Sequence, residues 1–143
     1  MTTMTKKTYS VIAVAALAVI AVAWWRFGSA PDGRGGGDPF ADLNMLPKYQ
    51  SDEATRQRTQ AEIDGTKALY EKEPDSWNTW IAIGNLRALM EDYPGAIAAY
   101  QKSLDIQPDN LLGYRNIAAI YKYNLRDFSK AETYYRLAIN NKP

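Results

Sequence analysis

The stretch "PDSWNTWIAIGNL", from Pro74 to Leu86, places a glycine in the most apolar turn of a predicted helix. Trp77 and Trp80 lie three residues apart, and the apolar patch that follows them contains Gly84. A glycine inside a helix is about 1 kcal/mol less favourable than alanine. We therefore expect a second helix to cross closely at Gly84, so that the two backbones approach each other.

This stretch has a counterpart further along the chain. Pro74 and Pro108 are 34 residues apart, and Pro108 and Pro143 are 35 apart. Between these prolines "WIAIGNLR" aligns with "YRNIAAIY", and "AIAAY" aligns with "AETYY". The second unit has one extra residue, which the alignment places near "NLRDFS". An internal repeat of this length is typical of proteins built from stacked units.

The repeated residues resemble the tetratricopeptide repeat (TPR) family, whose pattern has Trp, Leu-Gly and Tyr on one helix, then Ala, an aromatic residue and a closing Pro. Arg87 departs from the pattern, which has Tyr there. The resemblance covers about half of the chain and implies an all-α solenoid with two repeats, 74–108 and 109–143. It assigns structural roles to Trp80, Gly84, Ala96, Tyr100, Pro108, Tyr114, Ala118, Tyr121, Ala131 and Tyr135.

Capping signals set the expected helix boundaries. The sequence predicts helices from Ser76 to Met90, from Pro94 to Ile106, from Asp109 or Asn110 to Tyr123, and a last helix with a capping box of Ser129 and Glu132. Before the repeats, residues 51–73 read as one long helix that is capped by Ser51. Its apolar second half can cover the open side of the first repeat, as the end of a solenoid requires.

The N-terminal residues 1–27 are predicted to form a transmembrane signal-anchor. "YSVIAVAALAVIAVAWW", residues 9–25, has no charge, and its length is near the lower limit for a membrane span. Lys6, Lys7 and the α-amine precede the apolar run, whereas only Arg26 and Arg34 follow it. This excess of positive charge before the run favours a cytoplasmic N-terminus and an extracytoplasmic TPR domain. A cleaved signal peptide that ends near "GSA" and a buried soluble helix are the alternatives.

Residues 28–50 are predicted to be a Gly/Pro-rich linker that contains a short amphipathic motif. The motif is "DPFADLNMLPKY", in which Asp38 can cap a short helix and Pro47 can end it. We expect this helix to pack on the long helix or on the membrane surface. The alternative is a docking motif that a partner binds or that occupies the protein's own groove.

Composition argues against an enzyme. The chain has no Cys and no His, which excludes thiolate and imidazole chemistry together with metal sites that need these ligands, and we expect no cofactor or metal. Adjacent carboxylates such as Glu91 and Asp92 point apart on a helix and suit turns. The net charge of +1 gives no indication of nucleic-acid binding.

The resemblance implies a groove that binds a peptide segment or partner protein. The candidate groove residues are Asn78, Ile81, Asn85, Leu89, Leu112, Arg115, Lys122 and Tyr123. Asn85 and Asn116 match the asparagines that clamp a carboxylate in some TPR proteins, or they join two helices. The sequence thus predicts a membrane-tethered TPR adaptor or scaffold. The alternatives are an accessory or assembly subunit of a membrane complex, a secreted TPR protein, and homo-oligomerisation through the C-terminal helix.

Overall fold

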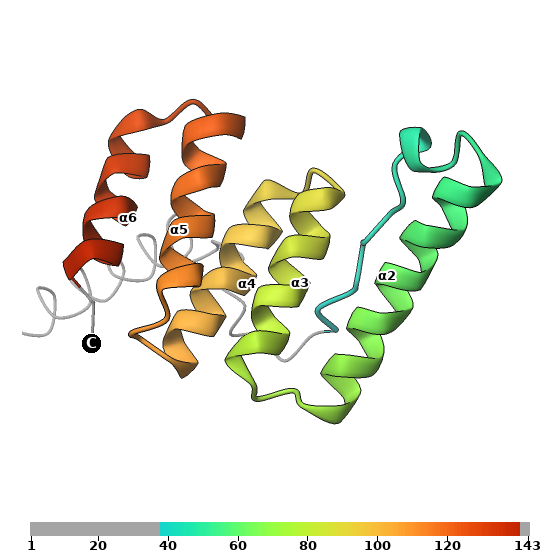
Figure 1. Cartoon of the computed structure of the whole chain (residues 1–143), viewed down its shortest axis with the longest axis horizontal. Coiled ribbons are helices and arrows are strands. Elements are labelled where there is room, and N and C mark those ends of the chain that lie inside the picture. Colours follow the sequence, from blue (N-terminus) through green and yellow to red (C-terminus); the bar gives the residue numbers. More distant parts are fainter. Residues whose placement is uncertain (1–37, 141–143) are drawn as a thin grey trace, which may run out of the picture. The chain divides into compact units, whose positions relative to one another are not determined.

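The computed structural model describes residues 38–140, which form an array of helices with no strand among them (Figure 1). The elements follow one another along the chain as a short 3₁₀ turn, a long helix and two helical hairpins. Their bounds are η1 (Pro47–Tyr49), α2 (Glu53–Lys72), α3 (Trp77–Leu89), α4 (Tyr93–Ile106), α5 (Leu111–Ala119), η2 (Ile120–Asn124) and α6 (Phe128–Asn140).

The hairpin of α3 and α4 explains Gly84. A Cβ atom at Gly84 would overlap the ring of Tyr100 on α4, with Cζ only 2.9 Å away. Ala96 is fully buried, and Tyr100 is almost so. The close helix packing expected at Gly84 is therefore confirmed, although the atoms that approach it belong to the Tyr100 ring and not to the backbone. Burial of a whole aromatic side chain offsets the low helix propensity of glycine.

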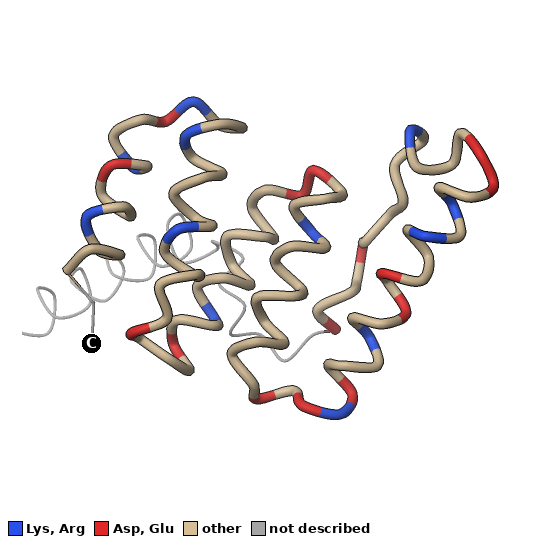
Figure 2. Tube along the Cα trace, in the orientation of Figure 1, with Lys and Arg blue, Asp and Glu red and all other residues tan. Residues whose placement is uncertain are grey.

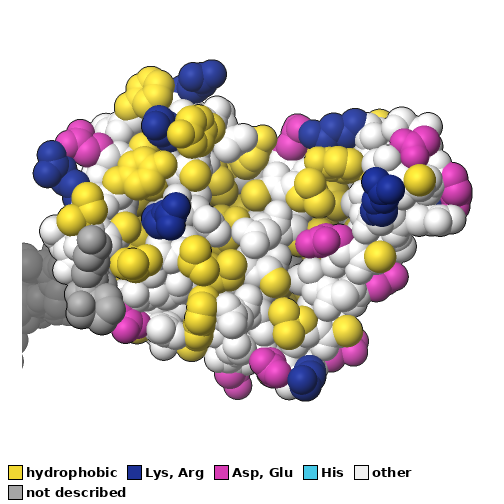
Figure 3. Space-filling view, in the orientation of Figure 1, with side chains coloured by type: hydrophobic (Ala, Val, Ile, Leu, Met, Phe, Trp, Pro, Cys, Tyr) yellow, Lys and Arg dark blue, Asp and Glu magenta, His cyan; other side chains and the backbone are white. Residues whose placement is uncertain are grey.

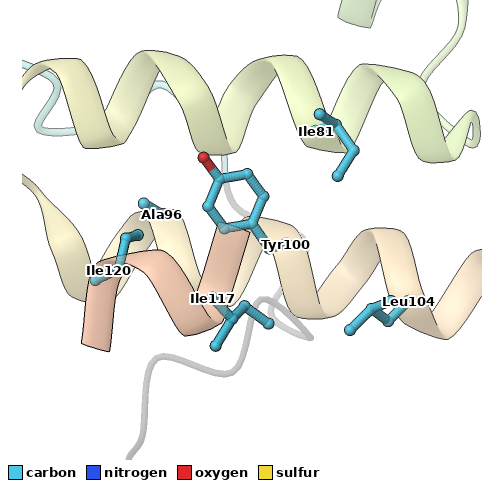
Figure 4. Close-up of a cluster of buried hydrophobic side chains, with 6 residues drawn as sticks. All are labelled: Ile81, Ala96, Tyr100, Leu104, Ile117 and Ile120. Atoms are coloured by element: carbon cyan, nitrogen blue, oxygen red, sulfur yellow. The ribbon is translucent and has the colours of Figure 1, made fainter. Parts of the chain in front are cut away.

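The main core lies between α3, α4 and α5 (Figure 4). A second glycine, Gly113 on α5, lies against α4, where a Cβ would be 2.7 Å from Cδ2 of Leu104. The sequence repeat did not single out Gly113, because the family pattern has no glycine there. The buried members of this core are Ile81, Ala96, Tyr100, Leu104, Ile117 and Ile120.

The extra residue of the second unit is accommodated by a π-helix. The predicted helix to Tyr123 ends as an α-helix at Ala119, and η2 follows with wider turns. The Leu125 amide donates to the carbonyl of Ile120, five residues earlier, at 3.0 Å. A π-turn takes one more residue than an α-turn. The chain then turns back through Arg126 at positive φ to begin α6.

Two of the predicted caps are wrong by one or two residues. Asp52, not Ser51, caps α2, since its carboxylate accepts the Thr55 amide at 2.9 Å. This hydrogen bond also lowers the pKa of Asp52. The predicted capping box of α6 does not form, because Asp127 accepts the Lys130 amide instead. In both cases a carboxylate, which carries charge toward the positive helix end, takes the capping position.

The motif of residues 38–49 is not the α-helix that the sequence predicts. It is a turn after Asp38, then an extended stretch, then η1, which Pro47 begins rather than ends. Its apolar side chains pack on a buried cluster of α2 and α3. The cluster is Ile63, Leu86 and Met90, covered by Phe40, Leu43, Met45 and Tyr49. The long helix and this segment together cover the open side of the first repeat.

Charges of both signs are spread along α2, whereas α3 and α4 carry few (Figure 2). No helix within residues 38–140 combines the length and apolarity that a membrane crossing needs. The predicted span, residues 9–25, lies outside the described residues, as does the first part of the linker.

Candidate protein-binding surface

The predicted groove helices, α3 and α5, lie next to each other. The Asn116 side-chain nitrogen donates to Oδ1 of Asn85 at 3.4 Å, and the Tyr100 hydroxyl donates to the same oxygen at 2.8 Å. The two asparagines therefore join α3 and α5, which is the second of the two roles that the sequence analysis considered for them. The oxygen of Asn85 is engaged within the chain.

Most of the candidate groove residues are exposed. Ile81 is the exception: it is only 8% exposed and belongs to the core, because its side chain faces α4 and α5. Its assignment to the groove is a correction that the structure requires. Lys122 is half-buried, and the exposed candidates are Asn78, Asn85, Leu89, Leu112, Arg115 and Tyr123.

The α5 end of this surface combines apolar and basic side chains. Leu112 is 45% and Tyr123 61% exposed. Within residues 38–140, neither Arg115 nor Lys122 has a carboxylate within ion-pair distance. The Lys122 ammonium lies 4.8 Å from the ring centre of Tyr123, and this neighbour raises the pKa of Lys122. Hydrophobic and basic side chains gather over the α5–α6 end in the space-filling view (Figure 3).

At the α3 end, the chain's own segment occupies part of the surface. The Tyr49 hydroxyl donates to the Leu89 carbonyl at 3.1 Å, and Lys48 forms an ion pair with Glu91. Phe40 lies edge-on to the ring of Tyr70, with the centroids 5.8 Å apart. The segment therefore packs on the long helix α2, as the sequence predicts, and it also covers the C-terminal end of α3.

Arg87, the departure from the family pattern, holds this segment in place. Its guanidinium donates to the Pro39 carbonyl from Nε at 3.2 Å and from Nη2 at 2.9 Å, and it pairs with Asp92. Nη2 also approaches the Ala41 carbonyl at 3.4 Å. Sequence reasoning missed this role, although the break in the pattern was its signal. Arginine suits it because its planar fork reaches several acceptors at once.

The carboxylates of this region are used by the fold. Asp92 pairs with Arg87 and accepts the Gly95 amide at 3.0 Å, while Glu91 pairs with Lys48. Within the described part of the chain, His, Cys, Asp and Glu form no cluster of three or more that could hold a metal.

Comparison with known proteins agrees with this arrangement. Residues 78–110 match the family model described as tetratricopeptide repeat. Tetratricopeptide repeat protein 37 of Xenopus laevis is 35% identical over 65 residues, and superkiller complex protein 3 of Homo sapiens is 36% identical over 59. These matches cover 45% and 41% of the chain but only 4% of each relative. No solved structure matches.

The family match begins one residue into α3, includes all of α4 and ends at the cap of α5. Residues 78–110, which include α4 and nearly all of α3, therefore match one tetratricopeptide repeat, and residues 38–140 form an all-helical fold of the kind that such repeats build.

Proposed function

We propose that this chain is a membrane-tethered adaptor whose repeats bind a peptide segment or partner protein through the exposed face of α3 and α5. Residues 9–25 would hold it at a membrane, with the repeats on the extracytoplasmic side. The repeat fold supports protein binding, because stacked helical hairpins form extended surfaces of this use. It supports a scaffold rather than an enzyme for the same reason.

One observation carries this proposal: within residues 38–140, Arg115 of α5 and Lys122 of η2 have no carboxylate within ion-pair distance, and both lie beside an exposed apolar surface. Arg115 and Lys122 flank Leu112 and Tyr123, which are accessible. A guanidinium binds a carboxylate through two parallel hydrogen bonds, and aromatic side chains with exposed rings are common anchors at interfaces. The favoured partner segment therefore has an apolar anchor and acidic residues next to it.

The test is charge reversal on this face. Full-length chain with Arg115→Glu and Lys122→Glu is expected to lose at least about ten-fold in affinity for its partner, about 1.4 kcal/mol or more. Partner capture from native membranes by photo-crosslinking is compared between wild type and variants. The matched control is Arg56→Glu with Arg58→Glu, which makes the same charge change on α2. Equal capture by the α5 variant would place recognition elsewhere.

The accessory-subunit alternative assigns specificity to the transmembrane segment or to the linker motif. In the structure the motif packs on α2 and α3 of its own chain, which favours recognition by the repeats. Replacing residues 9–25 by an unrelated span of equal length separates the two ideas. An adaptor keeps its partner after this exchange, whereas an accessory subunit loses its membrane complex.

A further inference from the structure

The outer face of α6 and the adjacent η2 form a shallow pocket of about 490 Å³. Its apolar lining includes Phe128, Ala131, Tyr135 and Ile139. Phe128 and Ile139 are 61% and 64% exposed, which is more than any other Phe, Leu, Ile or Met side chain among residues 38–140. We call this surface the end pocket.

In the first repeat the equivalent surface belongs to α4, and there α5 covers it. A shift of 35 residues aligns α4 with α6 and pairs the apolar residues one by one. In α4 these side chains are buried or half-buried under α5, against Ile117 and Ile120. The pairs are Tyr93 with Phe128, Ala96 with Ala131, Tyr100 with Tyr135, and Leu104 with Ile139.

The covered copy shows what kind of element fits. α5 approaches α4 through Gly113, whose Cα lies so close to Leu104 that a Cβ would be 2.7 Å from Cδ2. Four and seven residues later, Ile117 and Ile120 enter the core. A helix with a small residue at one position and branched apolar residues four and seven later therefore fits the end pocket, with the small residue over Ile139.

The rim of the end pocket differs from its covered copy in charge. Ala88, Ile97 and Gln101 of the first repeat correspond to Lys122, Glu132 and Arg136. Glu132 is already paired, since its Oε1 accepts from Arg136 at 2.7 Å. Lys122 has no carboxylate within ion-pair distance among residues 38–140. The rim therefore favours an occupant with negative charge.

We propose that the end pocket docks an amphipathic helix of a partner protein, with the small–branched–branched stripe of α5 and carboxylates on its flank. A second copy of this chain is a poorer occupant. Its α5 already packs on α4. Its own end pocket presents Phe128, Tyr135 and Lys122, and residues 38–140 offer Lys122 no carboxylate within ion-pair distance. An aromatic side chain cannot make the close approach that Gly113 makes.

The end pocket is separate from the α3–α5 face of the proposed function, although Lys122 borders both. Phe128 and Ile139 line only the end pocket, and Leu112 and Arg115 belong only to the α3–α5 face. Substitutions at Phe128 and Ile139 can therefore abolish binding at the end pocket without affecting the α3–α5 face, and substitutions at Leu112 and Arg115 can do the reverse.

The probe is a fluorescein-labelled peptide with the sequence of residues 109–124, in which Arg115 and Lys122 are replaced by glutamate. We expect fluorescence anisotropy to show saturable binding to the full-length chain. Phe128→Glu with Ile139→Glu in the protein should weaken binding at least about ten-fold, and so should Gly113→Leu in the peptide. Leu112→Glu in the protein is the matched control and should leave binding unchanged.

Two results would overturn the site: no saturable binding at about 1 mM peptide, or equal binding by the Phe128→Glu, Ile139→Glu chain. A second measurement identifies the occupant and does not depend on a disruptive variant. The full-length chain with Phe128→p-benzoylphenylalanine should crosslink to the peptide. A crosslinked dimer would assign the pocket to a second copy, and a crosslink to residues 1–37 would assign it to the chain's own N-terminal segment. Either of these two would overturn a partner helix.

Discussion

At the scale of single residues, the closest packing occurs at Gly84, and this makes a sharp prediction. Gly84→Ala should destabilise the fold by about 1–3 kcal/mol, because the added methyl group overlaps the Tyr100 ring. Gly84→Leu should abolish the fold. Gly65→Ala is the matched control: nothing lies within 4 Å of its Cβ position, so stability should rise by about 0.5–1 kcal/mol. Urea unfolding followed by circular dichroism measures both, and equal effects would contradict this account of the hairpin.

Tyr100 also gives a prediction about alkaline pH. Burial raises its pKa from 10.0 to about 12. The folded state therefore keeps a proton that the unfolded state loses, and stability should fall between pH 10 and 12 by about 1.4 kcal/mol per pH unit. Below pH 10 this contribution is fully present. Tyr100→Phe lacks this decline, although at pH 7 it loses the hydrogen bond to Asn85, worth about 1 kcal/mol. Parallel pH profiles of the two proteins would instead show that Tyr100 loses its proton at the same pH in the folded and unfolded states.

At the scale of elements, the segment of residues 38–49 depends on Arg87. Arg87→Lys should destabilise the protein by about 1–3 kcal/mol, because one ammonium cannot reach Pro39, Ala41 and Asp92 together. Hydrogen exchange should rise first in residues 38–50 and around the α3–α4 turn. Arg136→Lys, in an exposed pair on α6, is the control and should change stability by less than about 0.5 kcal/mol. Unchanged exchange in residues 38–50 would show that apolar contacts alone hold the segment.

The same elements show what sequence could and could not predict. The hairpins follow from local signals: a glycine opposite an aromatic residue, small residues at fixed spacing, and caps near the expected places. The conformation of residues 38–49 does not, because its contacts are with side chains 20 to 50 positions away, such as Ile63 and Arg87. Its local pattern alone favours a helix. The sequence showed the π-turn of η2 only as one extra residue in the second repeat. The alignment placed that residue slightly later in the chain and did not show that it forms a π-helix.

The candidate protein-binding surface was also predictable only in part. The faces of α3 and α5 follow from the repeat, and six of the eight candidates are exposed. Ile81 was assigned wrongly, since the pattern does not show that its side chain packs into the core with residues of α4 and α5. Arg87 and the end pocket were missed because each needs the placement of a distant element.

At the scale of the whole molecule, the described fold should begin at Asp38 rather than at Ser51. A chain that starts at Ser51 exposes Ile63, Leu86 and Met90, whose cover is Phe40, Leu43, Met45 and Tyr49. The lost burial should lower stability by about 2–4 kcal/mol, or the melting temperature by roughly 10 °C or more. A chain that starts at Asp38 keeps these contacts. We therefore expect it to melt near the temperature of the full-length protein in detergent, as measured by circular dichroism.

This difference decides how any truncation is interpreted. If the Ser51 chain melts early and fails to capture a partner, the failure reflects an exposed core and says nothing of where specificity lies. The Asp38 chain removes the apolar run and residues 28–37 of the linker while leaving the cap intact. Partner capture by the Asp38 chain would assign recognition to the repeats, because no membrane segment remains in it. Equal melting temperatures of the Ser51 and Asp38 chains would instead show that the segment adds no stability, and that α2 alone covers the first repeat.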